Sequence, residues 1–239
     1  MNLAIDIGNT RTKIGIFDGC NLKAVLVFDV LEELDLHKII QEYTVRKAIL
    51  SSTVTIPPKL QNELDEILQL IHLSSETPLP FKNLYATKNT IGKDRLALMA
   101  AAQSNYPNQH NLVIGCGTCI TFNFMNDKNE FLGGSIHPGL KMRLKAMHTF
   151  TNQLPLVALE NKADLMGNDT KSNLLSGVIF AAAKEIDGMI DEYLVKFPQM
   201  NIIITGGDAD LLVYRLKNQI FAISNLTLIG LNHILEYNA

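Results

Sequence analysis

Two short glycine-containing segments have the residue types needed to hold phosphate groups. The first, DIGNT, covers Asp6–Thr10 and is followed by Lys13; the second, GCGT, covers Gly115–Thr118, about half of the 239-residue chain further on. Each is flanked by alternating apolar residues, which predicts a β-hairpin with the small residues in its turn. Such a turn lets backbone N–H groups approach a phosphate, and hydroxyls and a lysine complete the anion site. Two such turns facing each other across a cleft would grip a nucleoside triphosphate, which indicates a phosphotransferase.

A third segment, GKDR at Gly92–Arg95, stands between a polar loop and a helix-forming run. The Asp94 carboxylate could accept a proton from an alcohol while Arg95 holds an acidic group of the substrate. The alternative interpretation is structural: Asp94 caps the helix, and Arg95 is a solvated residue of its first turn. Taken alone, the tetrapeptide favours the structural interpretation.

Three further segments each have a structural and a functional interpretation. TGGDA at Thr205–Ala209 follows an apolar strand and opens a helix, so its paired glycines could lie against a flat nucleoside, although such junctions are common in α/β proteins. GGSIHPG at Gly133–Gly139 alone indicates only a tight turn. GNDT at Gly167–Thr170 starts a long helix, where Asp169 or Thr170 could be either a cap or a ligand.

The cysteines allow a metal or redox interpretation that the rest of the sequence does not support. Cys116 and Cys119 form a C-x-x-C pair, and Cys20 is the third cysteine, an odd number that argues against a disulfide framework. A zinc site needs two further ligands, and the six histidines are scattered. A redox pair normally opens a helix, whereas this pair straddles a predicted hairpin turn. The favoured interpretation is that these two cysteines are small residues that fill a tight turn.

The composition is that of an ordinary globular enzyme. Hydrophobic residues make up 47% and charged residues 19% of the chain, enough for a sizeable core. The net charge is −3 without a Lys/Arg stripe, which argues against nucleic-acid binding. No stretch approaches the roughly 20 apolar residues of a membrane helix, and the MNLAID start lacks the features of a signal peptide. We therefore expect a cytoplasmic protein without a nucleic-acid or membrane partner.

The apolar patterns predict alternating strands and helices, and hence an α/β fold. Besides the two hairpins, strands are expected at 48–54, 131–136 and 201–204. Helices are expected at 31–43, from Pro57 to about Leu70, at 96–102, at 171–195, from Asp208, and at 225–237, and a loop at 74–89. We expect two lobes, residues 1–110 and residues 111–239, with a ligand cleft between them.

The ordered series of motifs resembles the type III pantothenate kinases, a family of the acetate and sugar kinase, Hsp70 and actin superfamily. The series runs DIGNT with a following lysine, tyrosine then GKDR, GxGTxIT, GGSIHPG, GNDT and TGGDA, and the resemblance extends from Asp6 to Gly230–Leu231. It implies two similar ribonuclease H-like, actin-like lobes with a cleft between them. It also implies transfer of the ATP γ-phosphoryl group to the primary hydroxyl of pantothenate, the first step of coenzyme A biosynthesis. Insensitivity to feedback by coenzyme A is expected as well.

The resemblance further implies roles for individual residues on the nucleotide side of the site. Asp6 would hold Mg²⁺ through water. The ATP-contacting residues would fall into three groups: Gly8, Asn9, Thr10 and Lys13 in the first phosphate loop, Gly117 and Thr118 in the second, and Gly206, Gly207 and Asp208 at the adenosine.

On the substrate side, the resemblance makes Asp94 the general base that faces the pantothenate hydroxyl. The remaining pantothenate-binding residues would be Tyr85, Gly92, Lys93 and Arg95, together with Thr170. Thr170 would reach the substrate across a subunit interface, so a homodimer is implied too.

Two positions depart from the family pattern. Gly115 stands where the family usually has an aspartate that helps hold a monovalent cation, K⁺ or NH₄⁺, and Asn123 stands where the same motif usually ends in aspartate. An asparagine offers a carbonyl oxygen, but up to two negative charges are lost. The sequence therefore predicts weakened or absent dependence on potassium or ammonium.

Three alternatives remain open at this stage. One is a non-catalytic, regulatory or accessory relative of the family, which the presence of Asp6, Lys13 and Asp94 argues against and Gly115 and Asn123 mildly favour. The second is a kinase of another small alcohol, such as a sugar. The third is a module that binds nucleotide without turnover.

Overall fold

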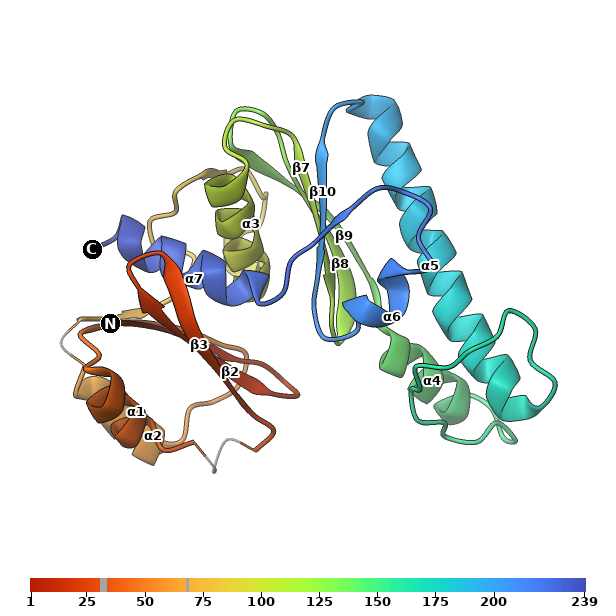
Figure 1. The fold of residues 1–239 in the computed structure, drawn as a ribbon, viewed down its shortest axis with the longest axis horizontal. Helices are drawn as coiled ribbons and strands as arrows, with labels where there is room; N and C mark the ends of the chain where they lie inside the picture. The colour runs from red at the N-terminus through yellow and green to blue at the C-terminus, as the bar shows by residue number, and fades with distance from the viewer. Residues whose placement is uncertain (31–33, 68) are drawn as a thin grey trace. The chain divides into compact units, whose positions relative to one another are not determined.

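The computed structural model describes residues 1–30, 34–67 and 69–239. The chain divides into two compact units, shown in Figure 1. Unit 1 comprises Met1–Asn108, Met125–Gly133 and Asn225–Ala239, and unit 2 comprises Gln109–Phe124 and Gly134–Ser224. Within the described part of the chain, no helix combines the length and the apolar character needed to cross a bilayer.

Unit 1 is built on a five-stranded mixed sheet with the strand order β3-β2-β1-β4-β5. The pairs β1–β2 and β2–β3 are antiparallel, and β1–β4 and β4–β5 are parallel. The first hairpin predicted from the sequence is thus confirmed. The strands are β1 (Asn2–Ile7), β2 (Thr12–Asp18), β3 (Asn21–Phe28), β4 (Lys47–Ser52) and β5 (Gln69–His72).

Two short helices cover one part of this sheet. Helices α1 (Leu36–Tyr43) and α2 (Pro58–Asp65) lie side by side in Figure 1 and contribute their apolar residues to one buried cluster with β1, β2 and β4. Asp35 caps α1 by accepting a hydrogen bond from the Lys38 amide, and Pro58 occupies the first turn of α2. Both starts follow from local sequence.

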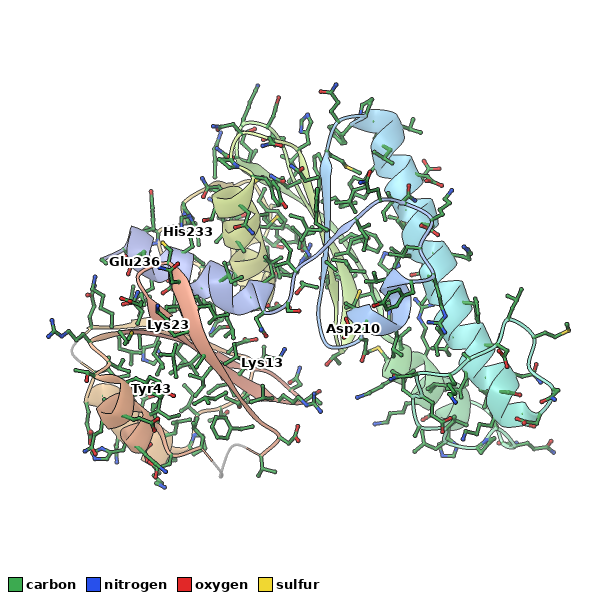
Figure 2. All side chains as sticks on the ribbon, viewed as in Figure 1. Lys13, Lys23, Tyr43, Asp210, His233 and Glu236 are labelled. Carbon is green, nitrogen blue, oxygen red and sulfur yellow. The ribbon has the colours of Figure 1, made fainter. Side chains whose placement is uncertain are left out.

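A second helix pair completes unit 1. Helices α3 (Lys93–Asn105) and α7 (Leu226–Tyr237) pack closely. Their backbones approach at Gly230, where any side chain would collide with the backbone of Ala97. Helix α7 is also tied to the sheet, since Asn2 donates to the side chains of Asn232 and Glu236, the latter labelled in Figure 2. Residues 225–239 were expected in the second lobe, whereas in the structure these contacts place them in unit 1.

Unit 2 is built on the strands β11-β10-β7-β8-β9, in that spatial order. Strand β10 is parallel to both β7 and β11, and β7 and β8 are joined by the two residues Gly117 and Thr118, as the second predicted hairpin requires. The strands are β7 (Asn111–Cys116), β8 (Cys119–Met125), β9 (Glu130–Pro138), β10 (Asn201–Thr205) and β11 (Phe221–Ala222). The first residues of β9 belong to unit 1, where they pair with β6 (Lys82–Asn83).

Helix α5 (Thr170–Lys196) is the main helix of unit 2 and runs beside its sheet in Figure 1. Its 27 residues bury an apolar stripe that includes Val178 and Ala182 in one cluster with Ile114 and Phe122 of the sheet. Helices α4 (Leu140–Thr149) and α6 (Ala209–Val213) contribute to the same cluster. This core fixes the carboxyl ends of β7 and β10, where two of the predicted binding motifs begin.

Several predicted element boundaries were wrong. The helix expected to reach about Leu70 ends at Asp65, and residues 69–72 instead form β5, because β4 offers an open edge for parallel pairing. The helix expected over 31–43 begins at Leu36, and positions 31–33 lie outside the described residues. The strand expected over 48–54 ends at Ser52. Strand β3, helix α4 and the short strands and 3₁₀ turn (Lys88–Thr90) were not predicted.

Candidate active site

The register of the unit 1 sheet surrounds Asp6 with polar side chains. Asp6 on β1 lies directly opposite Lys13 on β2 and opposite Ser51 on β4. Residues opposite each other in a sheet project from the same face. The sheet therefore presents a carboxylate flanked by an ammonium group and a hydroxyl. Figure 2 labels Lys13 on this hairpin.

The environment of Asp6 raises its pKa to about 6. Burial is the largest cause, because it disfavours the charged form, and the negative charge of Asp94 is the second. The Ser51 hydroxyl and the Lys13 ammonium lower the pKa and offset part of this rise. The Ser51 oxygen is buried near the carboxylate but has no partner at hydrogen-bonding geometry among the described residues. The charged form of Asp6 is therefore disfavoured in the folded protein, and a bound cation would stabilise it.

Asp94 reaches this region from the first turn of α3. The N-cap of α3 is Gly92, without a side-chain capping bond, so the alternative in which Asp94 caps the helix is wrong. Any side chain at Gly92 would collide with the carboxylate of Asp94, which shows how closely that carboxylate lies against the backbone. Lys93 donates to the carbonyl of Ser52 at 3.4 Å, which ties the start of α3 to the end of β4 beside Asp6. Two carboxylates and Lys13 thus share one part of unit 1.

Arg95 is buried among aromatic rings rather than solvated, so the second half of the structural alternative is also wrong. Its side chain is 4% exposed, and its guanidinium lies 5.5 Å from the ring centre of Tyr85 and 5.8 Å from that of Phe131. The rings of Tyr85 and Phe131 are stacked with their centres 6.2 Å apart. Such cation–π contacts orient a guanidinium.

Phe131 is a site residue that sequence reasoning missed. It lies on β9, 36 positions after Arg95, and nothing in its local sequence links it to Tyr85 or Arg95. The chain continues through Gly133, whose φ is +114°. A Cβ atom added to Gly133 would lie 3.4 Å from the Tyr85 ring. The family motif GGSIHPG therefore starts against the ring of Tyr85.

The first predicted phosphate turn is open to an approaching ligand. It spans Gly8–Arg11 and is closed by a hydrogen bond of 3.1 Å from the Gly8 amide to the Arg11 carbonyl. Asn9 and Thr10 at its tip are exposed. An exposed turn with amides and a hydroxyl beside Lys13 has the chemistry of a phosphate site.

In unit 2, the structure brings the second phosphate turn and the TGGDA segment together. The Asp208 amide donates to the carbonyl of Cys116 at 3.1 Å, and Gly206, with φ +113°, lies so close to Cys116 that any side chain there would collide with its backbone. Gly117 and Thr118 are exposed, and the space that a Gly207 side chain would fill is empty. Glycine is therefore required at 206 by backbone strain and packing, and at 207 it leaves a bare surface on which a flat group can lie.

The start of α5 settles which residue of GNDT is the helix cap. Asp169 is the N-cap and exchanges hydrogen bonds with Ser172 in a capping box. These bonds lower the pKa of Asp169. Thr170 is the exposed first residue of α5.

The Cys116 thiol of the C-x-x-C pair is buried. Burial, and then the charge of Asp208, raises the pKa of the Cys116 thiol to about 12, so it is protonated and unreactive. Among the described residues, no three His, Cys, Asp or Glu side chains gather as a metal site. The Asp6 carboxylate has the oxygen-ligand chemistry for a hard cation whose other ligands are water and phosphate.

Comparison with known proteins decides the family. The family model for type III pantothenate kinase matches residues 2–192, which is most of the chain. The chain belongs to this family. A type III pantothenate kinase from Christiangramia forsetii is 44% identical over 240 residues, which cover 100% of this chain and 99% of the relative.

Solved structures support the fold expected for a type III pantothenate kinase. A Campylobacter jejuni protein assigned to the Baf family of transcriptional activators superposes with a TM-score of 0.59 at 22% identity, covering 99% of this chain and 98% of that one. A Listeria monocytogenes protein assigned as an N-acetylmannosamine kinase gives a TM-score of 0.51 at 15% identity, covering 100% and 99%. At these identities the similarity shows the fold alone, and it confirms the α/β class with two ribonuclease H-like lobes.

Against the family pattern, Asn123 takes a definite structural role. Its side chain is fully buried, and its amide nitrogen donates to the Val113 carbonyl at 3.2 Å and to the Thr121 hydroxyl at 3.1 Å. Gly115 lies on the neighbouring strand, paired in register with Thr205 of β10. The positive end of an amide dipole thus sits between two oxygen atoms within this part of unit 2.

Proposed function

We propose that this type III pantothenate kinase transfers the γ-phosphoryl group of ATP to the primary hydroxyl of pantothenate, the first step of coenzyme A biosynthesis. Membership of the family supports the reaction, and the observation that carries it is the grouping of Asp6, Lys13 and Asp94 in unit 1. Phosphoryl transfer requires positioning, charge neutralisation and a carboxylate near the nucleophile, and these three residues supply those needs. Formation of phosphopantothenate from ATP, Mg²⁺ and pantothenate tests the proposal.

Each unit has its own set of residues proposed to contact ATP. In unit 1, Gly8, Asn9 and Thr10 direct polar groups to the phosphates, and Lys13 balances their charge. In unit 2, Gly117 and Thr118 contact the phosphates while Gly206, Gly207 and Asp208 approach the adenosine. Asp6 would hold Mg²⁺ through water, and the ion would supply neutralisation of the charge on the transferring phosphoryl group.

The acceptor alcohol is held on the α3 side. Asp94 orients the pantothenate hydroxyl and accepts its proton late in the transfer, because the transition state is loose. Arg95, held by the stacked rings of Tyr85 and Phe131, directs its guanidinium toward the pantothenate carboxylate. Gly92 leaves the space that the Asp94 carboxylate occupies. Lys93 fixes the start of α3 at the end of β4.

We infer that the Asn123 amide takes over the position of a monovalent cation. Its nitrogen donates to the Val113 carbonyl and the Thr121 hydroxyl, so it presents a partial positive charge to two oxygen atoms there. Gly115 offers no carboxylate to compensate the charge of a bound ion. The pair of substitutions therefore replaces an ion by an internal hydrogen-bond donor.

The expected result is turnover that is independent of the monovalent cation. Rates measured with potassium, with ammonium, and with only a bulky organic cation at equal ionic strength should agree within about twofold, a difference of roughly 0.4 kcal/mol. Restoring both carboxylates, as Gly115→Asp with Asn123→Asp, supplies the matched control and should create dependence on potassium. A strict requirement for potassium or ammonium in the natural chain would overturn the inference.

A homodimer is also proposed, with Thr170 reaching the substrate of the partner subunit. The segment between α4 and α5 supports an interface near Thr170, because it exposes large apolar side chains, with Phe150 84% and Met166 86% exposed. Large apolar side chains exposed in a contiguous patch are typical of interaction surfaces. The molar mass of the protein in solution checks this. The cytoplasmic location stays a prediction of the sequence.

The accessory-factor alternative has less support than catalysis. The similarity to the Baf family structure is a similarity of fold at 22% identity and carries no function. The loss of carboxylates at 115 and 123 affects the cation position and leaves Asp6, Lys13 and Asp94 unchanged.

A further inference from the structure

A network of charged side chains in unit 2 lies outside the residues assigned so far. Glu185 on α5 accepts two hydrogen bonds from Nη2 of Arg143 on α4, at 2.9 and 2.7 Å. The same carboxylate lies 2.6 Å from Nδ1 of His137 on β9. All three side chains are partly buried, so the contacts are less screened than surface ion pairs. Glu185 thereby joins three elements of unit 2 at one point.

Both ring nitrogens of His137 have a hydrogen-bonding partner. Because Glu185 is a carboxylate, Nδ1 must carry the proton that is shared with it, and Nε2 lies 2.7 Å from the hydroxyl of Ser135. The ring also packs against Phe122 of the core, with the ring centres 5.0 Å apart. The end of β9 therefore has little freedom to shift.

The segment that follows His137 lies directly against the second phosphate turn. Nε of Arg143 donates to the Pro138 carbonyl at 2.9 Å, so the network holds this segment through its backbone as well. The amide of Gly139 donates to the Thr118 carbonyl at 3.2 Å. A side chain at Gly139 would collide with the carbonyls of Gly117 and Thr118. Pro138–Gly139 thus supports the turn directly from one side.

We propose that Glu185, with Arg143 and His137, positions the Gly117–Thr118 turn for ATP and so acts as a set of positioning residues for phosphoryl transfer. The proposal rests on the assignment of this turn to the ATP phosphates. The turn itself is exposed and has few internal bonds, so its location depends on the backing segment. Small displacements of phosphate-facing amides reduce phosphoryl transfer, which depends mostly on positioning. Apart from Thr170 at the first turn of α5, the residues proposed to bind pantothenate lie in unit 1, and none of them belongs to the network, so KM for pantothenate should not respond.

The test compares Glu185→Gln with Glu192→Gln, which removes the same charge from an exposed position on the same helix. In the full-length protein, Glu185→Gln should raise KM for ATP about tenfold, equivalent to about 1.4 kcal/mol, with KM for pantothenate unchanged within twofold. Arg143→Lys, which keeps the charge but loses the bond to the Pro138 carbonyl, should give a smaller effect of the same kind. The Glu192→Gln control should match the natural protein in both constants.

Outcomes for this proposal and for the kinase assignment are distinguishable. An ATP KM that is unchanged in Glu185→Gln, or a loss of activity proportional to the fraction of unfolded protein seen by circular dichroism, overturns the positioning role. If the natural protein has no turnover, the kinase assignment fails, and direct titration with Mg-ATP then decides the positioning role. A tenfold weaker Kd in Glu185→Gln would support it, and an equal Kd would overturn it. If Glu185→Gln does not fold, Arg143→Lys serves in the same two measurements.

Discussion

Replacing Asp94 by asparagine should lower kcat by about 10²–10⁴-fold, the usual contribution of a general base, while the affinity for pantothenate changes little. Asparagine keeps the shape of the side chain and can hydrogen-bond the hydroxyl, but it cannot accept the proton. Because Gly92 rather than Asp94 caps α3, the substitution removes no helix cap and should leave the fold intact. Steady-state kinetics and pantothenate titration measure the two effects separately.

Asp65→Asn gives the matched control for this experiment. Asp65 is an exposed carboxylate at the end of α2 in the same unit, and its substitution should leave kcat within twofold of the natural value. A loss near the lower end of the range would agree with a late proton transfer. Full activity of Asp94→Asn would remove Asp94 from the mechanism.

Replacing Asp6 by asparagine should nearly abolish turnover and at the same time stabilise the protein. Turnover is lost because the neutral amide no longer holds Mg²⁺ through its water shell. The fold gains because ionised Asp6 is destabilising: its folded pKa of about 6 lies above the ordinary value of 3.8. Above pH 6 the carboxylate is charged in both states but is disfavoured in the folded one. The gain at neutral pH should be about 1–3 kcal/mol, since each pKa unit corresponds to 1.36 kcal/mol.

The effect of Asp6 on the stability of the fold should depend on pH. The destabilisation by Asp6 is absent below about pH 4, where the carboxyl group is protonated in both states, and develops as the pH rises from about 4 to 6. The melting temperature of Asp6→Asn should therefore equal that of the natural protein near pH 4 and exceed it at pH 7. In the natural protein, kcat/KM should fall as the pH drops below about 6, because the free enzyme loses its carboxylate. Equal melting temperatures at pH 7 would contradict the raised pKa.

Part of the site could be predicted from sequence because it is built from local patterns. A hairpin with its turn at Gly8–Arg11 places Lys13 opposite Asp6. The alternation of apolar residues that predicts the hairpin is therefore enough to predict this pair. In the same way, a strand followed by Gly206–Gly207 predicts a helix start with an exposed backbone. The ordered motifs then identified the family, which the comparisons confirmed.

The remaining features depend on contacts between distant segments. Ser51 lies beside Asp6 only because β4 pairs in parallel with β1, a register that no local signal specifies. Phe131 holds Arg95 although the two residues are far apart in the sequence, and α7 joins unit 1 through Gly230 and Asn232. The network of Glu185 was invisible in the sequence, because its residues come from a strand and two helices.

The most direct test of the account is whether the purified protein converts pantothenate to 4′-phosphopantothenate with ATP and Mg²⁺. Mass spectrometry of the product, together with measurement of ADP, should show one phosphopantothenate for each ADP, formed at least about 10²-fold more slowly by Asp94→Asn. ADP formation without phosphopantothenate, or phosphorylation of a sugar in preference to pantothenate, would contradict the assignment.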